Sequence, residues 1–387
     1  MIDNFHIVEG QLRDISEHLP IGFYKELPKL SEGPLKGYPR VYGLSWAFVA
    51  HTDSRFDPEL LIQFVKAYQN VQPLTIGEIW AIAITLRVVL VENLRRLSVR
   101  ILSSMQARKS ADLLADELLG LSTGSIPKTL ESYLKGFEGK QLRKSFLVHL
   151  IQRLRYHDPT VATTMQWVHK KLAEMNLTAD EIVSLEHNNQ SAANVTVRNI
   201  ITSMRLISAF DWRTFFESIS FVDDTLKINP VFAAMDFTSQ DRYRHAIEEL
   251  NRGSEYSELD ITKLLILKTE KYKTEQQLAG NPVEEKITDP GYYLISTGRK
   301  DLEKEIDFSS SFGSKVLDFY ISNAKWGYIS TILLFTGILL FIPIYLSFLN
   351  GVSLLGLLIL SVTGFFPASD IAVALSNKIV AKFAKPA

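Results

Sequence analysis

Apolar residues recur every three or four positions along most of the chain, and the alternation typical of strands is scarce. Leu90, Leu94 and Leu97, for example, fall on one side of a helix. Thr75 followed by Glu78 has the spacing of a capping box, in which two side chains bond backbone N–H groups at a helix start. The pattern predicts an all-α fold, with helices near 3–18, 40–51, 58–70, 76–106, 109–120, 127–135, 140–156, 160–174, 179–191, 194–209, 211–225, 239–252, 258–279 and 299–323.

One stretch departs from this amphipathic pattern. Its 44 residues, Trp326 to Ser369, include no Asp, Glu, Lys or Arg, and the turn-forming pair Asn350-Gly351 divides it. A helix needs about 20 apolar residues to cross a bilayer, so the stretch predicts a two-helix transmembrane hairpin with crossings at 326–349 and 352–369. A hairpin buried in a soluble core is the alternative, but uncharged runs longer than about 18 residues favour membrane helices.

The flanks of the hairpin indicate its orientation. The N-terminal residues 1–14 lack the basic start and apolar core of a signal peptide, so we expect the soluble part to be cytoplasmic. Two crossings return the chain to the side on which it started, and the positive-inside rule places basic flanks in the cytoplasm. The basic residues on the two flanks are Lys315, Lys325, Lys378, Lys382 and Lys385.

The segment after the hairpin has its own periodicity. Ile371, Leu375, Ile379 and Phe383 recur near the helical period, which suits a helix lying in the membrane interface or a linker helix. Linkers rich in turn-forming residues are expected at 24–39 and 281–298. The predicted parts of the chain are 1–36 (N-terminal helix and linker), 37–280 (helical cytoplasmic domain), 281–325 (linker and amphipathic helix), 326–369 (transmembrane hairpin) and 370–387 (interfacial or linker helix).

Composition excludes several kinds of chemistry. The 42 basic and 43 acidic residues give a net charge of −1, which does not suit nucleic-acid binding. The chain has no Cys, so disulfides, thiolate nucleophiles and Cys metal sites are excluded. It contains no phosphate-binding Gly-rich loop and no H-E-x-x-H metal motif. Asp223 and Asp224 are adjacent and lack the Asp-x-Asp spacing of nucleotide-sugar transferases, so we expect a helix end or a solvated face there.

The densest polar cluster lies between two predicted helices, at His51, Asp53, Arg55 and Asp57. It could act as an acid/base or ligand-holding loop. The alternative is a capping loop in which Asp57 caps the next helix and Arg55 pairs locally, because short polar side chains between helices usually cap.

Three arginines are further candidates. Arg87 lies on an apolar helix face, where an unpaired charge would be costly, so we expect a salt bridge or a carbonyl clamp, with binding of a ligand phosphate as the alternative. Arg198 and Arg205 are seven residues apart and share a face. They could grip phosphates or pair with acidic residues such as Glu217. We assign no catalytic, cofactor-binding or metal-binding residue.

Six long segments, in order along almost the whole chain, resemble the N-terminal region of bacterial cyclic β-1,2-glucan synthases. They are GYPRVYGLSWAFVAHTDSRFDPELL (37–61), QPLTIGEIWAIAITLRVVLVENLRRL (72–97), NVTVRNIITSMRLISAFDW (194–212), QDRYRHAIEEL (240–250), DPGYYLI (289–295) and FPASDIAVALSNKIV (366–380).

The resemblance implies a part of a very large bacterial inner-membrane enzyme. In that family, a glycosyltransferase domain of family 84 follows a hydrophobic segment like this one and uses UDP-glucose and a divalent cation. This chain stops where that domain would begin, so we expect a fragment that lacks the catalytic domain, needs no cofactor of its own and inherits no catalytic residue of the family.

The sequence-based hypothesis is that the chain anchors and positions a glycosyltransferase domain or subunit at the lipid bilayer and is inactive alone. A free-standing, membrane-tethered scaffold or adaptor protein is the alternative. A third hypothesis is a module that binds a small molecule or glucan through Arg87, Arg198 or the loop 51–57.

Overall fold

A computed structural model describes residues 4–19, 22–119, 121, 142–154, 162–309 and 323–383. Within these ranges the chain is helical and has no strand, so the predicted all-α fold is confirmed. The helices are α1 (Phe5–His18), α2 (Phe23–Glu26), α3 (Arg40–His51), α4 (Pro58–Gln69), α5 (Ile76–Leu118), α7 (Lys144–Leu154), α8 (Ala162–Glu174), α9 (Ala179–Ala209), α10 (Trp212–Ile219), α11 (Phe221–Leu226), α12 (Pro230–Ala233), α13 (Phe237–Arg252), α14 (Glu258–Leu278), α15 (Glu285–Thr288), α16 (Pro290–Ile295), α17 (Arg299–Glu305), α19 (Ala324–Leu349) and α20 (Leu354–Phe383).

The chain divides into two compact units. The first comprises Met1–Arg244 and Glu258–Pro290, and the second comprises His245–Ser257 and Gly291–Ala387. The first unit therefore contains most of the amphipathic helices, and the second contains the apolar hairpin.

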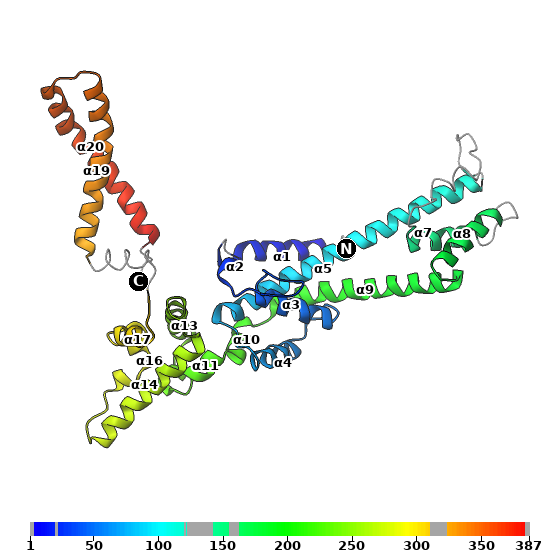
Figure 1. Cartoon of the computed structure of the whole chain (residues 1–387), viewed down its shortest axis with the longest axis horizontal. Coiled ribbons are helices and arrows are strands. Elements are labelled where there is room, and N and C mark those ends of the chain that lie inside the picture. The colour runs from blue at the N-terminus through cyan, green and yellow to red at the C-terminus, as the bar shows by residue number, and fades with distance from the viewer. Residues whose placement is uncertain are drawn as a thin grey trace. The chain divides into compact units, whose positions relative to one another are not determined.

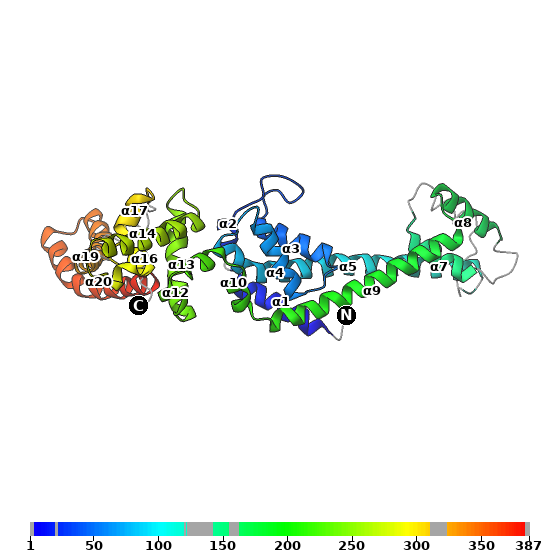
Figure 2. The same cartoon turned by 90° about the horizontal axis from the view of Figure 1, so that it is seen from below.

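Helix α5 organises the first unit. It starts at the predicted capping box, in which Thr75 and Glu78 bond each other's backbone N–H, and α1, α3, α7 and α9 pack along it. Figures 1 and 2 show α9 running beside α5 from the group of α1 and α3 to the pair α7 and α8. A separate apolar cluster at that far end includes Leu147, Leu150 and Ile182, all fully buried. One long helix thus joins two packed regions.

Two predicted breaks within long helices are wrong. The predictions 76–106 and 109–120 are one helix, α5, and the predictions 179–191 and 194–209 are one helix, α9. Neither junction contains Pro or Gly, and both carry Ala and other residues that a helix accommodates, so no residue there forces an end.

Elsewhere the structure has more helix ends and shorter helices than the sequence predicts. The single helix predicted at 211–225 is divided at Ser220, whose extended backbone ends α10 and whose side chain accepts from the N–H of Asp223 to cap α11. Short helices occur in both predicted linkers, α2 in the first and α15 and α16 in the second. The helix predicted at 299–323 ends as α17 at Glu305, and residues 310–322 lie outside the described part, as does the helix predicted at 127–135.

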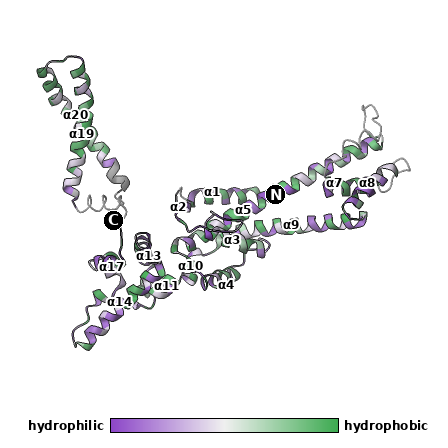
Figure 3. Ribbon diagram, in the orientation of Figure 1, coloured by the Kyte–Doolittle hydropathy of each residue, from purple (hydrophilic) through white to green (hydrophobic). Residues whose placement is uncertain are grey.

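The second unit contains the predicted hairpin, formed by α19 and α20 (Figure 3). Lys325–Leu349 and Leu354–Lys378 are long and apolar enough to cross a membrane, and only 6% and 11% of their most apolar windows are buried. Core helices of soluble proteins bury such residues, whereas these present Leu355, Phe366 and Phe341 on the surface.

Small residues line the contact between α19 and α20. Ala372 and Ser376 are fully buried, Ala368 is 8% exposed, and a Cβ on Gly364 would lie 3.0 Å from a methyl group of Leu340. Small side chains let two helices approach closely where a lipid environment offers no hydrophobic driving force between them. The boundary predicted at 369/370 is therefore not a helix boundary, because α20 continues through Pro367 and packs on α19 beyond it.

Candidate functional site

The loop between α3 and α4 lies against α9. Asp53 and Ser54 have φ of 50° and 63°, a left-handed conformation that Asp tolerates better than most residues. The Asp53 carboxylate accepts hydrogen bonds from Thr196 Oγ1 at 2.7 Å and from Asn199 Nδ2 at 3.3 Å, and its carbonyl accepts from Asn199 at 3.0 Å. Asp53 therefore joins the loop to α9.

Ser203 completes this junction from within the core. Its buried hydroxyl accepts from the N–H of Phe56 at 2.8 Å and donates to the carbonyl of Ser54 at 2.7 Å. On the other side, Asn93 of α5 donates to the Ser54 hydroxyl at 2.7 Å. The loop is thus a clamp between α5 and α9.

The capping alternative for this loop is confirmed. The Asp57 carboxylate accepts from the N–H of Leu60 at 3.1 Å and caps α4, and Arg55 lies 3.8 Å from Asp57. His51 is the exposed last residue of α3, whereas Asp53 is engaged with α9. The structure therefore does not bring His51, Asp53 and Arg55 together as an acid/base group.

Arg87 forms the predicted carbonyl clamp. Its guanidinium donates to the carbonyls of Ala83 at 3.1 Å and Ile207 at 3.4 Å, while Nε lies 3.7 Å from the Asp14 carboxylate. Burial lowers the pKa of Arg87, and the charge of Asp14 opposes this effect. Arg87 accordingly ties α5 to α9 and to α1.

A cavity of about 520 Å³ lies beside this clamp, lined by Trp80 and Trp212 among others. Aromatic walls with a nearby cation suit a small polar ligand with an apolar face. Two of its polar side chains have protein partners: Asp14 pairs with Arg87, and the ring Nδ1 of His18 is 3.0 Å from the carbonyl of Asp14. The cavity therefore lies beside the contacts by which Arg87 joins α5 to α9 and α1.

Arg198 and Arg205 remain on the surface of α9. Arg205 donates to the side-chain oxygen of Asn4 at 2.9 Å, and Glu217 pairs instead with Arg213 at 3.5 Å. The suggested pairing of Arg205 with Glu217 is therefore wrong. No feature of the described residues brings Arg198 and Arg205 onto a shared ligand.

Two buried ion pairs were not found by sequence reasoning. Glu78 is fully buried and receives two bonds from Arg40, at 2.9 Å to Oε1 and 2.5 Å to Oε2, which link α3 to the start of α5. Burial would lower the pKa of Arg40, but the hydrogen bonds and charge of Glu78 raise it above its ordinary value. Because the partners are 38 residues apart, no local spacing could reveal the pair.

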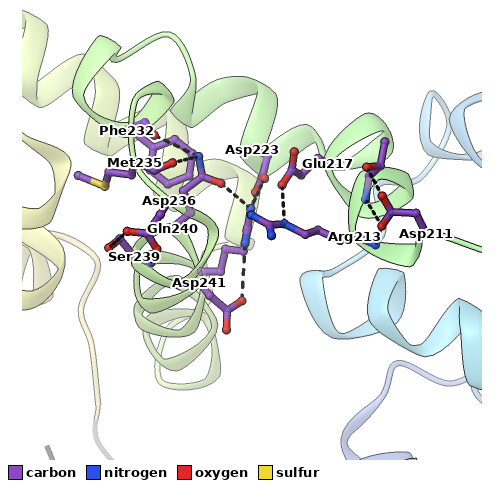
Figure 4. Close-up of polar contacts among 12 residues, drawn as sticks. Asp211, Arg213, Glu217, Asp223, Phe232, Met235, Asp236, Ser239, Gln240 and Asp241 are labelled. Carbon is purple, nitrogen blue, oxygen red and sulfur yellow. Dashed lines mark hydrogen bonds and ion pairs between the residues drawn. The ribbon is translucent and has the colours of Figure 1, made fainter.

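The second pair joins α13 to α11. Arg244 and Asp223 are both fully buried, with Nε 3.0 Å from Oδ1 and Nη2 2.5 Å from Oδ2, and the guanidinium lies 4.8 Å and 4.7 Å from the ring centres of Phe216 and Phe237. Figure 4 shows Asp223 within this polar network. The predicted helix end is correct for Asp223, but the predicted solvated face holds only for the exposed Asp224.

A groove further along α5 is basic. It measures about 620 Å³ and is lined by Arg100, Arg108, Arg143 and Lys144, against one acid, Glu186. Glu186 pairs with Arg108 at 3.6 Å. The remaining positive charge gives the groove an attraction for anions.

A smaller cavity adjoins this groove, because Leu97 and Arg100 line both. In it the Arg96 guanidinium lies 5.4 Å from the ring centre of Trp46, a cation–π contact. In the part of the chain that the structure describes, no group of three or more His, Asp or Glu side chains could hold a metal ion.

The described residues thus define a class of protein: an all-helical chain with an apolar two-helix hairpin, in which buried polar clusters connect long helices. Over its whole length it is similar to the cyclic beta-(1,2)-glucan synthase NdvB of Rhizobium meliloti, at 33% identity across 393 aligned residues, which confirms the resemblance seen in the six segments. The match covers 100% of this chain but spans only 13% of that protein. No family model matches the chain.

Proposed function

We propose that this chain is the membrane-anchoring helical part of a cyclic β-1,2-glucan synthase and positions a glycosyltransferase at the membrane. The observation that carries the proposal is the similarity to NdvB along every described element of the chain. A match that ran over one helix would reflect common composition, whereas 33% identity over the whole length requires a shared arrangement of elements.

The hairpin supports a membrane address. Its two apolar helices expose their side chains, and basic residues Lys325 and Lys378 stand at their outer ends. The positive-inside rule then places both ends in the cytoplasm and Gly351 on the opposite side of the inner membrane. In this proposal the first unit faces the cytoplasm, where UDP-glucose is available to the transferase.

The partner is a glycosyltransferase domain or subunit that supplies the sugar-transfer residues, UDP-glucose site and divalent cation. This chain contributes by holding the transferase in a fixed position. Clamps such as Arg87 and Ser203 hold α5 and α9 together, so a partner bound to these helices would keep a fixed position. Fixed positioning raises reaction rates by removing orientational freedom from the reactants.

A chimera tests this proposal. The segment of NdvB that aligns with this chain is deleted or replaced by this chain, and membrane vesicles are supplied with radiolabelled UDP-glucose and Mg²⁺. We expect the deletion to abolish glucan formation, the chimera to restore it and this chain alone to form no glucan. Glucan made by the chain alone, or a chimera no better than the deletion, contradicts the proposal.

A second chimera separates anchoring from positioning. In it residues 326–369 are replaced by an unrelated transmembrane hairpin, while the first unit is kept. We expect activity to persist at a reduced level, because the cytoplasmic helices still hold the transferase. If the chimera with the native hairpin forms no glucan but the chain still captures other membrane proteins, the results favour a free-standing scaffold.

A binding role is the second candidate function, and the basic groove on α5 favours it. Its four basic side chains suit an anionic ligand such as a nucleotide sugar. Titration of the purified chain with UDP-glucose and with neutral β-1,2-glucan, followed by calorimetry, distinguishes charge-driven from sugar-driven binding. Binding that Arg100→Gln and Arg143→Gln weaken supports this function, and no heat with either ligand contradicts it.

A further inference from the structure

The second apolar helix of the hairpin contains one acidic residue. The candidate span Leu354–Lys378 includes Asp370, and the other charged residue of this span is its terminal Lys378. Ionisable side chains within a membrane-spanning helix are costly unless they meet a partner, and they commonly mark functional contacts. Asp370 therefore calls for a partner if α20 crosses the bilayer.

The contact between α19 and α20 gives the depth of Asp370. The Tyr328 hydroxyl donates to Asn377 Oδ1 at 2.8 Å, so Asn377 is level with the start of α19. Asp370 precedes Asn377 by seven residues, which at 1.5 Å per residue is about 10 Å further into the membrane. Tyrosine favours the membrane–water interface, so this distance is measured from near the edge of the hydrocarbon core.

The direction of the Asp370 side chain prevents it from reaching that interface. Side chains on a helix tilt toward the helix N-terminus, and the N-terminus of α20 is at the turn, on the far side of the membrane. The carboxylate of Asp370 therefore tilts toward the bilayer centre. A long side chain can bend back to the headgroups, but Asp has a single methylene.

The hairpin itself does not supply the partner. Ala368, Ala372 and Ser376 are buried, whereas Asp370, roughly half a turn around the helix from Ala368 and Ala372, is exposed. No hydrogen bond or ion pair involves the Asp370 side chain among the residues that the structure describes. Phe366, one turn before Asp370, is 71% exposed on the same face.

A second acceptor lies on the same side of α20. Pro367 has no N–H, so the carbonyl of Thr363 lacks its usual helical donor. Thr363 is seven residues before Asp370, which places both on one face two turns apart, and helix carbonyls point toward the C-terminus, here toward Asp370. The Thr363 hydroxyl donates to the carbonyl of Ile359, so it does not donate to this face. The Thr363 carbonyl oxygen therefore adds partial negative charge to the face that presents the Asp370 carboxylate.

We propose that Asp370 is an acceptor site that binds a Lys or Arg side chain from another membrane-spanning helix. The charge of Asp370 selects the partner, because a basic side chain both neutralises the carboxylate and donates hydrogen bonds to it. The inference rests on the membrane address proposed above. It adds that the hairpin binds a basic helix on the exposed face of α20 that carries Asp370.

The test uses two synthetic membrane-spanning peptides of about 23 Leu and Ala residues. One has a single Lys about seven residues from one end, and the other has Leu there. The full chain, which has no Cys of its own, receives one cysteine in place of Asn350 for a fluorescent label and is reconstituted in phosphatidylcholine vesicles. Energy transfer then reports association. We expect the Lys peptide to bind at least about tenfold more tightly than the Leu peptide.

Variants of the chain show which residue causes the preference for the Lys peptide. Asp370→Asn and Asp370→Leu should abolish the preference for the Lys peptide, whereas Phe366→Leu, on the same exposed face, should keep it. Equal binding of the two peptides to the unaltered chain, or a preference that survives Asp370→Leu, overturns the inference.

Alkaline carbonate extraction of the same vesicles separates this outcome from failure of the proposed function. A chain that carbonate strips from the vesicles is not integrated, and both proposals fall. A chain that stays integrated without discriminating between the peptides overturns the acceptor site alone.

Discussion

Ser203 shows how a single buried hydroxyl connects two elements. It bonds the N–H of Phe56 and the carbonyl of Ser54, so Ser203→Ala leaves two buried backbone groups without this partner. We expect a loss of about 1–3 kcal/mol in the free energy of unfolding, measured by urea denaturation of the full chain in detergent micelles. Thr202→Ala, at the exposed neighbouring position, should change it by less than about 0.5 kcal/mol. Equal effects of the two variants would contradict the clamp.

The buried pair of Arg244 and Asp223 gives a second prediction at this scale. Asp223→Leu removes the buried carboxylate that pairs with a fully buried guanidinium, so it should lower the free energy of unfolding by about 3–5 kcal/mol. Adding Arg244→Met should recover most of that loss, because two apolar side chains can replace a buried ion pair. The exposed Asp224→Asn is the control. The pair has no special role if the double variant is as unstable as the sum of the two single variants.

At the scale of elements, the sequence predicted helices reliably and their ends less well. The caps at Asp57 and Thr75 lie where predicted, because capping depends on residues three apart. The false breaks within α5 and α9 arise because short stretches of sequence hold only local signals, whereas packing against other helices keeps α5 and α9 continuous.

In the candidate site too, local contacts could be predicted from the sequence, whereas contacts between distant helices could not. The local roles of Asp57 and Arg55 could be predicted, and so could the need of Arg87 for a partner, but the identity of that partner could not. Ile207 lies 120 residues from Arg87, and the pattern of side chains along one helix contains no information on such a distance.

The N-terminal cap of α9 gives a pH prediction. Hydrogen bonds from the backbone and side chain of Thr178 lower the pKa of Glu181 below its ordinary value of 4.5. Since the pKa is lower in the folded state, this stabilisation is present above about pH 4.5 and is lost as pH falls through the lower folded value. Hydrogen exchange at the start of α9 should therefore rise, relative to intrinsic rates, between about pH 5 and about pH 3. Glu181→Gln should remove the pH dependence, and a variant that retains it would refute this role.

The close contact between α19 and α20 gives the second prediction at this scale. Ala372 is fully buried there, so Ala372→Leu should force the helices apart, whereas Ala374→Leu on the exposed side should not. Cysteines in place of Tyr328 and Asn377, whose side chains bond, can be joined by a short bismaleimide. We expect the crosslinking yield to fall several-fold with Ala372→Leu alone. An unchanged yield would mean that small residues at this contact are not required.

At the scale of the whole molecule, the cysteine-free sequence makes the orientation of the hairpin testable. Single cysteines in place of Asn350 and Lys378 can be labelled separately with a membrane-impermeant maleimide in spheroplasts. The positive-inside rule predicts that Asn350→Cys is labelled from outside and that Lys378→Cys is labelled only after the membrane is opened. The reverse pattern would place the first unit outside the cytoplasm and remove the transferase from its sugar nucleotide.

Helix α20 has one further consequence. It is continuous from Leu354 to Phe383, so a rotation of its membrane portion about the helix axis is transmitted to its last turn. One inserted residue after Lys378 would turn the end of the helix by about 100°, whereas seven inserted residues, nearly two turns, would return it close to its original direction. The direction in which the last turn of α20 points is therefore fixed by how the membrane part of the helix is rotated in its contacts.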